Sequence, residues 1–463
     1  MRQAALSELA PAAFGALIAA ICVSVPVQAE TISGALSKAY VFSPDLNAAR
    51  ASTRAIDENV ARAMSGYRPT ISATADAGLS RQERDSLGAQ PSTTLRTTPR
   101  GYGLQVQQNL WNGNRTVNSV RQADSQVLQS REQMRLSEQT LLNNAAAAYM
   151  DVLRDTAILN LRRNNVEVLE QQLRQTRERF NVGEVTRTDV AQSEAALAEG
   201  NSQVIVAQSN LQSRLGNYRQ FIGEQPRSLS PAQPLFRLVP TSLNAAIGFS
   251  QKSHPQIQAA LHNVDAAALA VRIAEGQLYP TVNLTGSYAQ RWDAQQPGLN
   301  TNNASLVASL NIPIYEGGAV YALVRQSKEQ MGQARLQADL AREQVRAQVV
   351  NAWGVWQNVG PLLASAQARA RAEEIALNGV REEARVGQRT TLDVLNAQQR
   401  LLAARSEIVT VQRERVVSSY SLMASVGDLN ARRLGLAVQN YDPTIHFEQV
   451  RGKWIGTRTP DGR

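Results

Sequence analysis

The sequence contains the same succession of motifs twice, and this duplication constrains the fold more than any other feature. The stretch FNVGEVTRTDV at Phe180–Val190 returns as ARVGQRTTLDV at Ala384–Val394, 204 positions later. Upstream, SPDLNAA at Ser43–Ala49 matches HPQIQAA at His254–Ala260. A repeat of this length predicts two structurally equivalent halves of about 200 residues each.

The spacing of the repeat also locates a length difference. YRPT at Tyr67–Thr70 matches LYPT at Leu278–Thr281 at an offset of 211, whereas Trp111–Gly113 matches Tyr315–Gly317 at an offset of 204. The difference of seven residues (211 minus 204) falls between the two matches. We therefore expect one loop of the first half to be longer than its counterpart.

Four stretches with alternating apolar and polar residues predict two strands in each half. Each is about ten residues long, which is the length that a tilted strand needs to cross a bilayer. The aromatic residues at the ends of these stretches are typical of a membrane interface: Tyr67, Trp111, Tyr279 and Tyr315. Alternation alone is equally consistent with four half-buried strands of a soluble sheet.

The remaining sequence favours long helices in coiled-coil packing. Apolar residues recur every seven positions in several series. These series are Val120 to Ala148, Leu159 to Phe180, Val190 to Tyr218 and Leu395 to Met423. Small residues such as Ser193, Gly200 and Ala207 lie between them and permit close helix approach. A helix of some seventy residues from Gly113 to Val182 would be about 100 Å long. Each half is thus read as helix, two strands, long helix, turn and long helix.

The first 29 residues are interpreted as a signal peptide. Arg2 precedes an apolar run, and VQAE places Ala29 at a plausible cleavage site. The single cysteine, Cys22, lies within this segment, so the exported chain would contain no disulfide. No later segment has about 18 consecutive apolar residues, so no membrane helix is expected.

The charge and motif content exclude several classes of function. The net charge of +9 comes from arginines interleaved with Glu and Gln, which favours solvated helix faces over a nucleic-acid surface. His254 and His262 have no Cys or nearby carboxylate to complete a metal site. No phosphate-binding loop, serine-hydrolase motif or cysteine nucleophile occurs. We therefore predict that the chain is not an enzyme and needs no cofactor.

Four strands cannot close a barrel, and an open sheet edge in lipid leaves backbone groups unpaired. The smallest transmembrane barrel has about eight strands. If the four strands cross a membrane, then at least two copies of the chain must contribute. An exported, soluble coiled-coil scaffold or adaptor remains the alternative, although the lipoyl-like domain typical of adaptors is not found.

The combined order of these motifs resembles the TolC family of outer-membrane efflux and secretion channels. SPDLNAA, YRPT and LYPT before strands, PIYEGG after a strand, and the two repeated turns carry the resemblance over Thr31 to Leu429. It implies a mainly α fold with a small β part, in which antiparallel coiled-coil helices form a tunnel. Four strands per chain would complete a 12-stranded barrel in a homotrimer.

The same resemblance implies the setting and the partners. The chain would lie in the outer membrane of a Gram-negative bacterium, surrounded by lipid, with a large periplasmic extension. It would work with a periplasmic adaptor (membrane fusion) protein and an inner-membrane transporter of the ABC or RND type, in type I secretion or multidrug efflux. The substrate is left open, because it depends on the transporter.

The resemblance further assigns roles at the repeated turns. Asp189, preceded by Thr188, and Arg389 match a pair that holds the tunnel entrance shut. Asp393 matches one acidic constriction ring, and Asn396 replaces the acid of the second. The adaptor-docking tips would be Val182, Gly183 and Glu184 in the first turn and Val386, Gly387 and Gln388 in the second. From the residues alone, Asp189 and Asp393 are equally placed to cap the following helices, and both roles can coexist.

We accordingly divide the chain into five segments. Residues 1–29 form the signal peptide, 30–225 the first repeat, and 226–242 a proline-rich linker that we expect to form part of an equatorial girdle. Residues 243–429 form the second repeat, and 430–463 a polar tail that we expect to be frayed.

Overall fold

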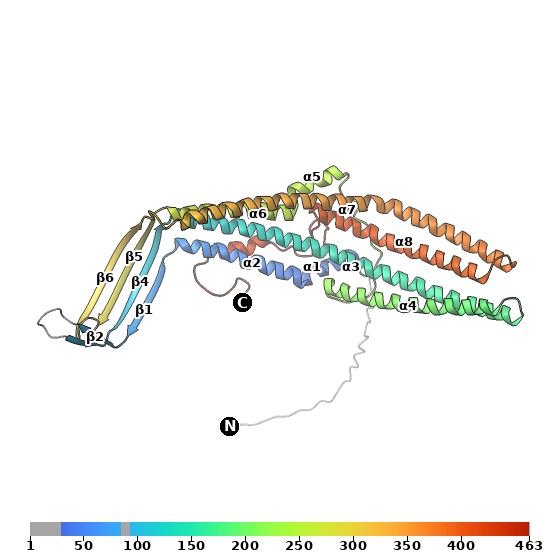
Figure 1. Ribbon diagram of the computed structural model, residues 1–463, viewed down its shortest axis with the longest axis horizontal. Coiled ribbons are helices and arrows are strands. Elements are labelled where there is room, and N and C mark those ends of the chain that lie inside the picture. Colours follow the sequence, from blue (N-terminus) through green and yellow to red (C-terminus); the bar gives the residue numbers. More distant parts are fainter. Residues whose placement is uncertain (1–28, 85–92, 463) are drawn as a thin grey trace, which may run out of the picture.

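The computed structural model describes residues 29–84 and 93–462. The molecule is elongated, with a sheet at one end and helical hairpins reaching to the other (Figure 1). The first half contains α1 (Ile32–Phe42), α2 (Pro44–Met64), η1 (Ser65–Tyr67), β1 (Thr70–Ala77), β2 (Ser80–Arg84), β3 (Thr93–Thr97), β4 (Arg100–Trp111), α3 (Arg115–Asn181) and α4 (Arg187–Ile222). The second contains α5 (Leu243–Ser253), α6 (Pro255–Glu275), η2 (Gly276–Leu278), β5 (Thr281–Trp292), β6 (Asn300–Asn311), α7 (Ala319–Arg385) and α8 (Thr391–Val426), and α9 (Pro443–Arg451) follows.

The duplication extends to the lengths of the helices. Helices α3 and α7 each have 67 residues, and α4 and α8 each have 36. Helices α2 and α6 each have 21 residues and each begin with a proline in the first turn, after Ser43 and His254 respectively. A proline is tolerated at this position because its missing N–H would have no partner within the helix. The predicted succession of elements is therefore confirmed in both halves.

The longer loop of the first half contains structure that the sequence pattern did not predict. Strands β2 and β3 form a separate two-stranded antiparallel sheet within it. Their sequences, SRQER and TTLRT, lack the apolar alternation that predicts the long strands, so the pattern does not indicate a second hairpin there. Residues 85–92 between them, and residues 1–28 of the predicted signal peptide, lie outside the described part of the chain.

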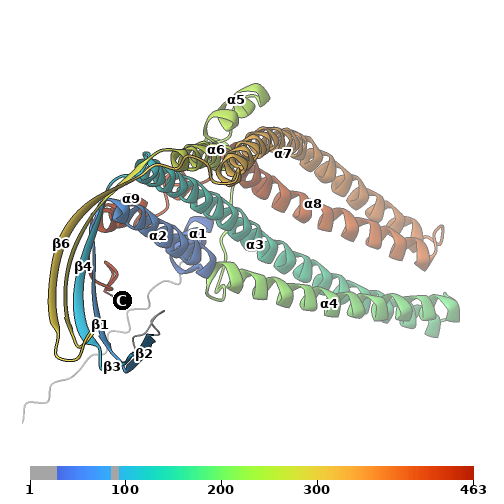
Figure 2. The ribbon, with the colours of Figure 1, turned by 60° about the vertical axis from the view of Figure 1, so that its left-hand side comes forward.

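The four long strands form one antiparallel sheet in the order β1-β4-β5-β6. Strand β4 joins the two halves by pairing with β5, from Arg100 opposite Trp292 to Trp111 opposite Val282. All residues of β1 and β6 are exposed, and the helices extend away from the sheet instead of covering it (Figure 2). The alternative of a half-buried soluble sheet is therefore wrong for the chain by itself, and the outer edges of β1 and β6 have no partner strand among the described residues.

The helices pack as two antiparallel hairpins, α3 with α4 and α7 with α8, which meet along α3 and α8. The seam of α4 is formed by small residues: Ser193, Gly200 and Ala207 are buried at seven-residue spacing. A Cβ atom at Gly200 would lie 2.9 Å from Cδ1 of Leu169 on α3, so glycine permits the close approach. The predicted heptad packing is thus present, and on α4 the small positions are buried whereas the apolar positions before Tyr218 are half-buried. None of the described helices has an apolar stretch long enough to cross a membrane.

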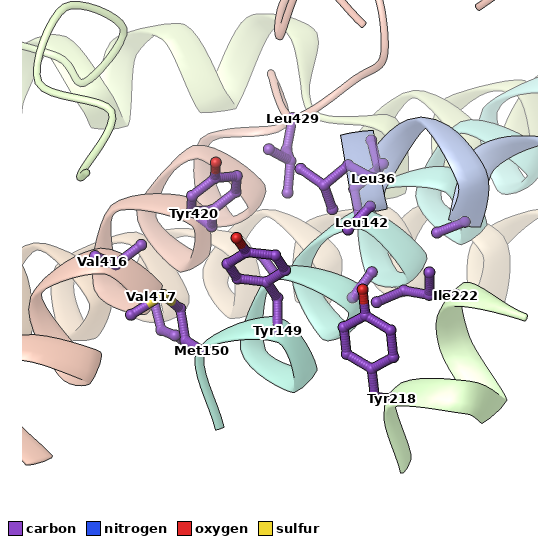
Figure 3. Packing of buried hydrophobic residues seen from close by; sticks show 14 of the residues in the cluster. Leu36, Leu142, Tyr149, Met150, Tyr218, Ile222, Val416, Val417, Tyr420 and Leu429 are labelled. Atoms are coloured by element: carbon purple, nitrogen blue, oxygen red, sulfur yellow. The ribbon is translucent and has the colours of Figure 1, made fainter. Parts of the chain in front are cut away.

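The main core lies near the middle of the molecule, where α1, α3, α4 and α8 meet (Figure 3). Tyr149 and Tyr218 are its largest fully buried side chains. The Tyr149 hydroxyl lies 2.7 Å from the Glu30 carbonyl oxygen and 2.6 Å from that of Ser230. It therefore ties the start of the first half to the 226–242 segment, whose Leu229, Leu235 and Leu238 pack on the same core.

The C-terminal tail is docked, so the expectation that it frays is wrong. Helix α9 packs on α2, where His446 Nδ1 lies 2.9 Å from the buried Asp57 Oδ2. The guanidinium groups of Arg131 and Arg451 both lie over the ring of Phe447, at 5.1 and 5.4 Å from its centre. The sequence of the tail is polar, but its few apolar and ionic groups find partners on elements far away in the chain.

His254 has a structural role and predicts a pH dependence. The Nδ1 atom of His254 accepts a hydrogen bond of 3.1 Å from the Gln256 N–H, and this bond caps the start of α6. The residue is buried, with 2% of its surface exposed. Burial lowers the pKa of His254 to about 4, and the charge of Arg135 acts in the same direction. As the pH falls below the ordinary histidine pKa of about 6.5, the unfolded chain gains a proton that the folded chain excludes until the pH approaches 4.

We expect the folded chain to lose stability over this window, by up to roughly 3 kcal/mol. His254→Ser supplies the cap that Ser43 provides in the first half, without a titrating group. The variant should lose less in thermal midpoint between pH 7 and pH 5 than the parent, measured by helical circular dichroism. Equal losses in both proteins would contradict the role of His254.

Candidate functional site: the two hairpin tips

The two turns identified in the sequence lie at the far end of the molecule from the sheet (Figure 1). In the first, Gly183 adopts φ +81° after α3, Glu184 N–H donates to Arg179 O at 2.9 Å, and Gly183 N–H donates to Phe180 O at 3.0 Å. This left-handed cap satisfies the last carbonyl groups of the helix and favours glycine. The second turn repeats it at Gly387, with φ +79° and a Gln388 N–H to Glu383 O distance of 2.9 Å.

Each turn is followed by a reciprocal cap of the next helix. Asp189 N–H donates to Thr186 Oγ1 at 3.3 Å, and Thr186 N–H donates to Asp189 Oδ2 at 2.9 Å. Thr390 and Asp393 form the same pair at 3.2 and 3.0 Å. The capping interpretation is therefore confirmed for both aspartates, and it explains why the turn sequence occurs twice.

The caps also set the charge of the two carboxyl groups. The Thr186 hydroxyl and N–H hold the pKa of Asp189 below its ordinary value, with smaller effects from Thr391 of the other tip and from Arg179. The N–H and hydroxyl of Thr390 likewise lower the pKa of Asp393. Both groups are thus ionised at neutral pH, and each tip has a fixed negative charge at the start of its second helix.

The predicted gating residues lie at the tips, but the single chain pairs them differently. Arg389 Nε lies 2.7 Å from Glu383 Oε2 within its own tip. No ion pair joins Arg389 to Asp189 among the residues that the structure describes. Thr188 and Asn396 are exposed and Asp393 is half-buried. Gating by Asp189 and Arg389 therefore stays a prediction, which requires Arg389 to leave Glu383.

Glu383 was missed by the sequence analysis. Its only signal was a carboxylate six positions before Arg389, and such a spacing does not indicate contact unless a turn lies between them. The Schellman-type turn at Gly387 brings the two side chains together.

The predicted docking residues present nearly the same surface at both tips. Val182 and Val386 are each 72% exposed, which is unusual for valine. Glu184 and Gln388 follow the left-handed glycines Gly183 and Gly387 and are also exposed. The tips differ mainly in that Glu184 pairs with Arg179 at 3.0 Å in the first, while Gln388 is uncharged in the second.

A network of charges lies between the tips and the core. We call it the Arg–Asp network: Asp151, Arg154 and Asp155 on α3, Arg214 on α4 and Arg413 on α8. Arg413 Nε lies 2.8 Å from Asp151 Oδ1, and Arg154 Nε lies 2.6 Å from Asp155 Oδ1. Because it joins α3, α4 and α8, it connects the two hairpins. In the described ranges, no cluster of three or more His, Cys, Asp or Glu residues could hold a metal ion.

Comparison with known proteins gives consistent matches over most of the chain. The family model described as outer membrane efflux protein matches it twice, at residues 35–224 and 247–428. Outer membrane efflux protein BepC of Brucella suis biovar 1 (strain 1330) is 42% identical over 435 residues, covering 94% of this chain and 93% of that protein.

Two further comparisons extend the same result. Outer membrane protein TolC of Escherichia coli (strain K12) is 26% identical over 431 residues, covering 89% of this chain and 85% of that protein. The crystal structure of the Campylobacter jejuni CmeC outer membrane channel aligns with a TM-score of 0.78 at 16% identity, covering 91% of this chain and 89% of that one.

Proposed function

Because the chain belongs to the outer membrane efflux protein family, we propose that three copies of it assemble into one continuous exit duct. The chain is an outer-membrane efflux or secretion channel with a helical part in the periplasm, in agreement with its relatives and not with a soluble scaffold.

The observation that carries the proposal is the open four-stranded sheet. Strands β1 and β6 are its edges, and in the part of the chain that the structure describes every residue of these two strands is exposed. An open edge in lipid is costly, because each unpaired backbone group lacks a partner there. Pairing β6 of one copy with β1 of the next removes every edge. Three copies give 12 strands (three times four) and a closed barrel.

The helical part has matching open edges. Helices α4 and α7 lie on the outside of the two hairpins and carry exposed large apolar residues. Ile205 and Val206 on α4 are 66% and 56% exposed, and Leu336 and Leu340 on α7 are 72% and 56% exposed. Packing α7 of one copy against the first half of the next would bury these side chains, which are otherwise unexplained on a monomer.

The duplication gives the ring a set of nearly equivalent docking points for its partners. Each copy contributes two nearly equivalent tips, so three copies present six in a circle. We infer that a periplasmic adaptor docks on these tips through the exposed Val182 and Val386. An inner-membrane transporter of the ABC or RND type would supply the energy, and the chain itself would catalyse no reaction. Removal of residues 1–29 by signal peptidase would precede assembly.

The gate is the part of the proposal that single substitutions test. Arg389→Gln should open the entrance and raise the mean conductance in planar bilayers by at least about twofold, because exposed pairs are weak singly but three act together. Arg385→Gln is the matched control, since Arg385 lies in the same tip and, among the described residues, forms its ion pair with the neighbouring Glu382, at 3.1 Å. Equal conductance in both variants and the parent would contradict gating by Arg389.

The assembly itself is tested by its location and mass. The chain should fractionate with outer membranes and, before heating, migrate in SDS at about three times the monomer mass. Planar bilayers containing it should show discrete channels. Recovery of a folded, water-soluble monomer from the periplasm would overturn the proposal and restore the scaffold alternative.

A further inference from the structure

The end of the C-terminal tail reaches the base of β1. Arg68, two residues before β1, donates from Nη1 to the Lys453 carbonyl oxygen at 2.7 Å. Its guanidinium also lies over the Trp454 ring, 4.7 Å from the centre. Trp454 and the next residue, Ile455, are nonetheless 68% and 88% exposed. A tail held in place by specific contacts therefore presents two large apolar side chains that no described residue of the same chain covers.

The repeat shows which surface faces Arg68. By the offset of 211, Arg68 corresponds to Tyr279, and by the offset of 204, Tyr315 corresponds to Trp111. Within the chain, Trp111 and Tyr279 are in contact, with ring centres 6.4 Å apart and an edge-on geometry. This contact belongs to the junction at which the first half, after β4, meets the second half, before β5.

A closed ring repeats that junction between copies. The end of β6 and the start of α7 in one copy would meet η1 and β1 of the next, as the end of β4 meets η2 and β5 within the chain. Tyr315 of one copy then takes the place of Trp111, against Arg68 in the place of Tyr279. The exposures agree: Trp111, whose junction is filled, is 39% exposed, whereas Tyr315 is 77% exposed.

We propose that Lys453–Ile455 form an intersubunit clasp that receives the segment around Tyr315 of the neighbouring copy. Trp454, stacked on Arg68, offers an aromatic face to Tyr315 and Ile455 offers an aliphatic one to Ile314, which is 91% exposed in the single chain. This inference rests on the proposed ring and adds a partner for the tail within it.

The position of the tail supports the proposal that a neighbouring copy of the chain, and not another molecule, contacts Lys453–Ile455. Figures 1 and 2 both place the coloured segment that follows α9 below α2, on the side away from α3 and α7. This is the side at which the next copy would join. The junction within the chain is reinforced by a covalent connection between the halves, whereas the junction between copies is not. The tail occurs once per chain and is anchored on α2 through His446 and Asp57 and on α3 through Phe447 and Arg131, so it is placed to reinforce only the second kind of junction.

Photo-crosslinking in outer membranes tests the clasp directly. p-Benzoylphenylalanine in place of Ile455 should yield crosslinked dimers whose linked peptide contains residues 312–318. The same probe in place of Leu336 on α7 reports ring formation independently of the tail. If the Leu336 probe links copies while the Ile455 probe gives lipid adducts or only links within one chain, the clasp is overturned and the ring stands. If neither probe links copies, the ring is overturned, and the clasp with it.

A second measurement assesses what the clasp contributes. Trp454→Ala should lower the temperature at which SDS-resistant trimers dissociate by roughly 5 °C, whereas Trp454→Phe should retain most of the parent value. Ile445→Ala is the control for the tail, because Ile445 is 56% exposed on α9. An unchanged dissociation temperature in Trp454→Ala would overturn the proposal, and helical circular dichroism verifies that each variant is folded.

Discussion

Gly113→Ala is expected to prevent the two halves of the chain from packing together at the junction between the end of β4 and the start of β5. Gly113 has φ +66°, and a Cβ atom there would lie 2.3 Å from the Gly276 carbonyl oxygen and 2.9 Å from the Tyr279 Cβ. The first contact is with backbone, so no side-chain rotation relieves it. The left-handed conformation adds about 1–2 kcal/mol for any residue with a Cβ. We expect the variant to be degraded or to accumulate unfolded, as measured by outer-membrane yield and helical circular dichroism.

Gly317→Ala is the matched control, because Gly317 occupies the same position in the second half. It has φ +65°, but a Cβ atom there would meet nothing within 4 Å in the described chain. The variant should therefore fold. If copies form a ring, Gly317 faces Ser65 of the neighbour as Gly113 faces Gly276, and folded Gly317→Ala chains should fail to form SDS-resistant trimers. Normal trimers of Gly317→Ala would contradict the equivalence of the two junctions, and normal folding of Gly113→Ala would contradict the clash.

Arg413→Ala is expected to cause the second large effect, through the Arg–Asp network. Arg413 is 20% exposed and its partner Asp151 is 14% exposed, so the pair is mostly removed from water. Removing one partner leaves a partly buried carboxylate whose charge is less well compensated. Because Arg154 and Arg214 remain near Asp151, we expect a loss of about 2 kcal/mol per chain, seen as a lower thermal midpoint.

Arg369→Ala provides the comparison for this effect. Arg369 and Glu407 are 2.7 Å apart, but their side chains are 52% and 38% exposed. Solvent screens such a pair, so its loss should cost under about 1 kcal/mol. Asp151→Asn combined with Arg413→Ala should be less harmful than the sum of the two single changes. Additive effects, or equal effects of Arg413→Ala and Arg369→Ala, would show that the network does not join the hairpins as described.

The features that the sequence predicted well are those that depend on local periodicity. Alternation identified the long strands, seven-residue spacing identified the helices, and Gly183 and Gly387 marked the turns, since left-handed backbone favours glycine. The duplication strengthened each prediction, because two independent stretches had to agree. The caps at Thr186 and Thr390 were also readable, because a capping box spans only three residues.

The features that escaped prediction depend on contacts between distant residues. The docking of α9 needs Asp57 opposite His446, and that of Trp454 needs Arg68, in both cases more than 380 positions away along the chain. The hairpin of β2 and β3 is held by backbone pairing and shows no apolar alternation. At the tips, sequence could place Arg389 and Asp189 but could not reveal that Arg389 contacts Glu383 in the single chain.

The equal lengths of corresponding helices have a consequence for how such a protein can change. Every residue adds about 1.5 Å to a helix, so one heptad displaces a tip by about 10 Å. Since α3 and α7 both have 67 residues and α4 and α8 both have 36, the two tips end at the same level. An insertion in one hairpin alone would leave a staggered rim. The reach across the periplasm can therefore be altered only by matched additions of whole heptads to four helices at once, so any partner that must meet the rim squarely faces a distance that changes in steps and not gradually.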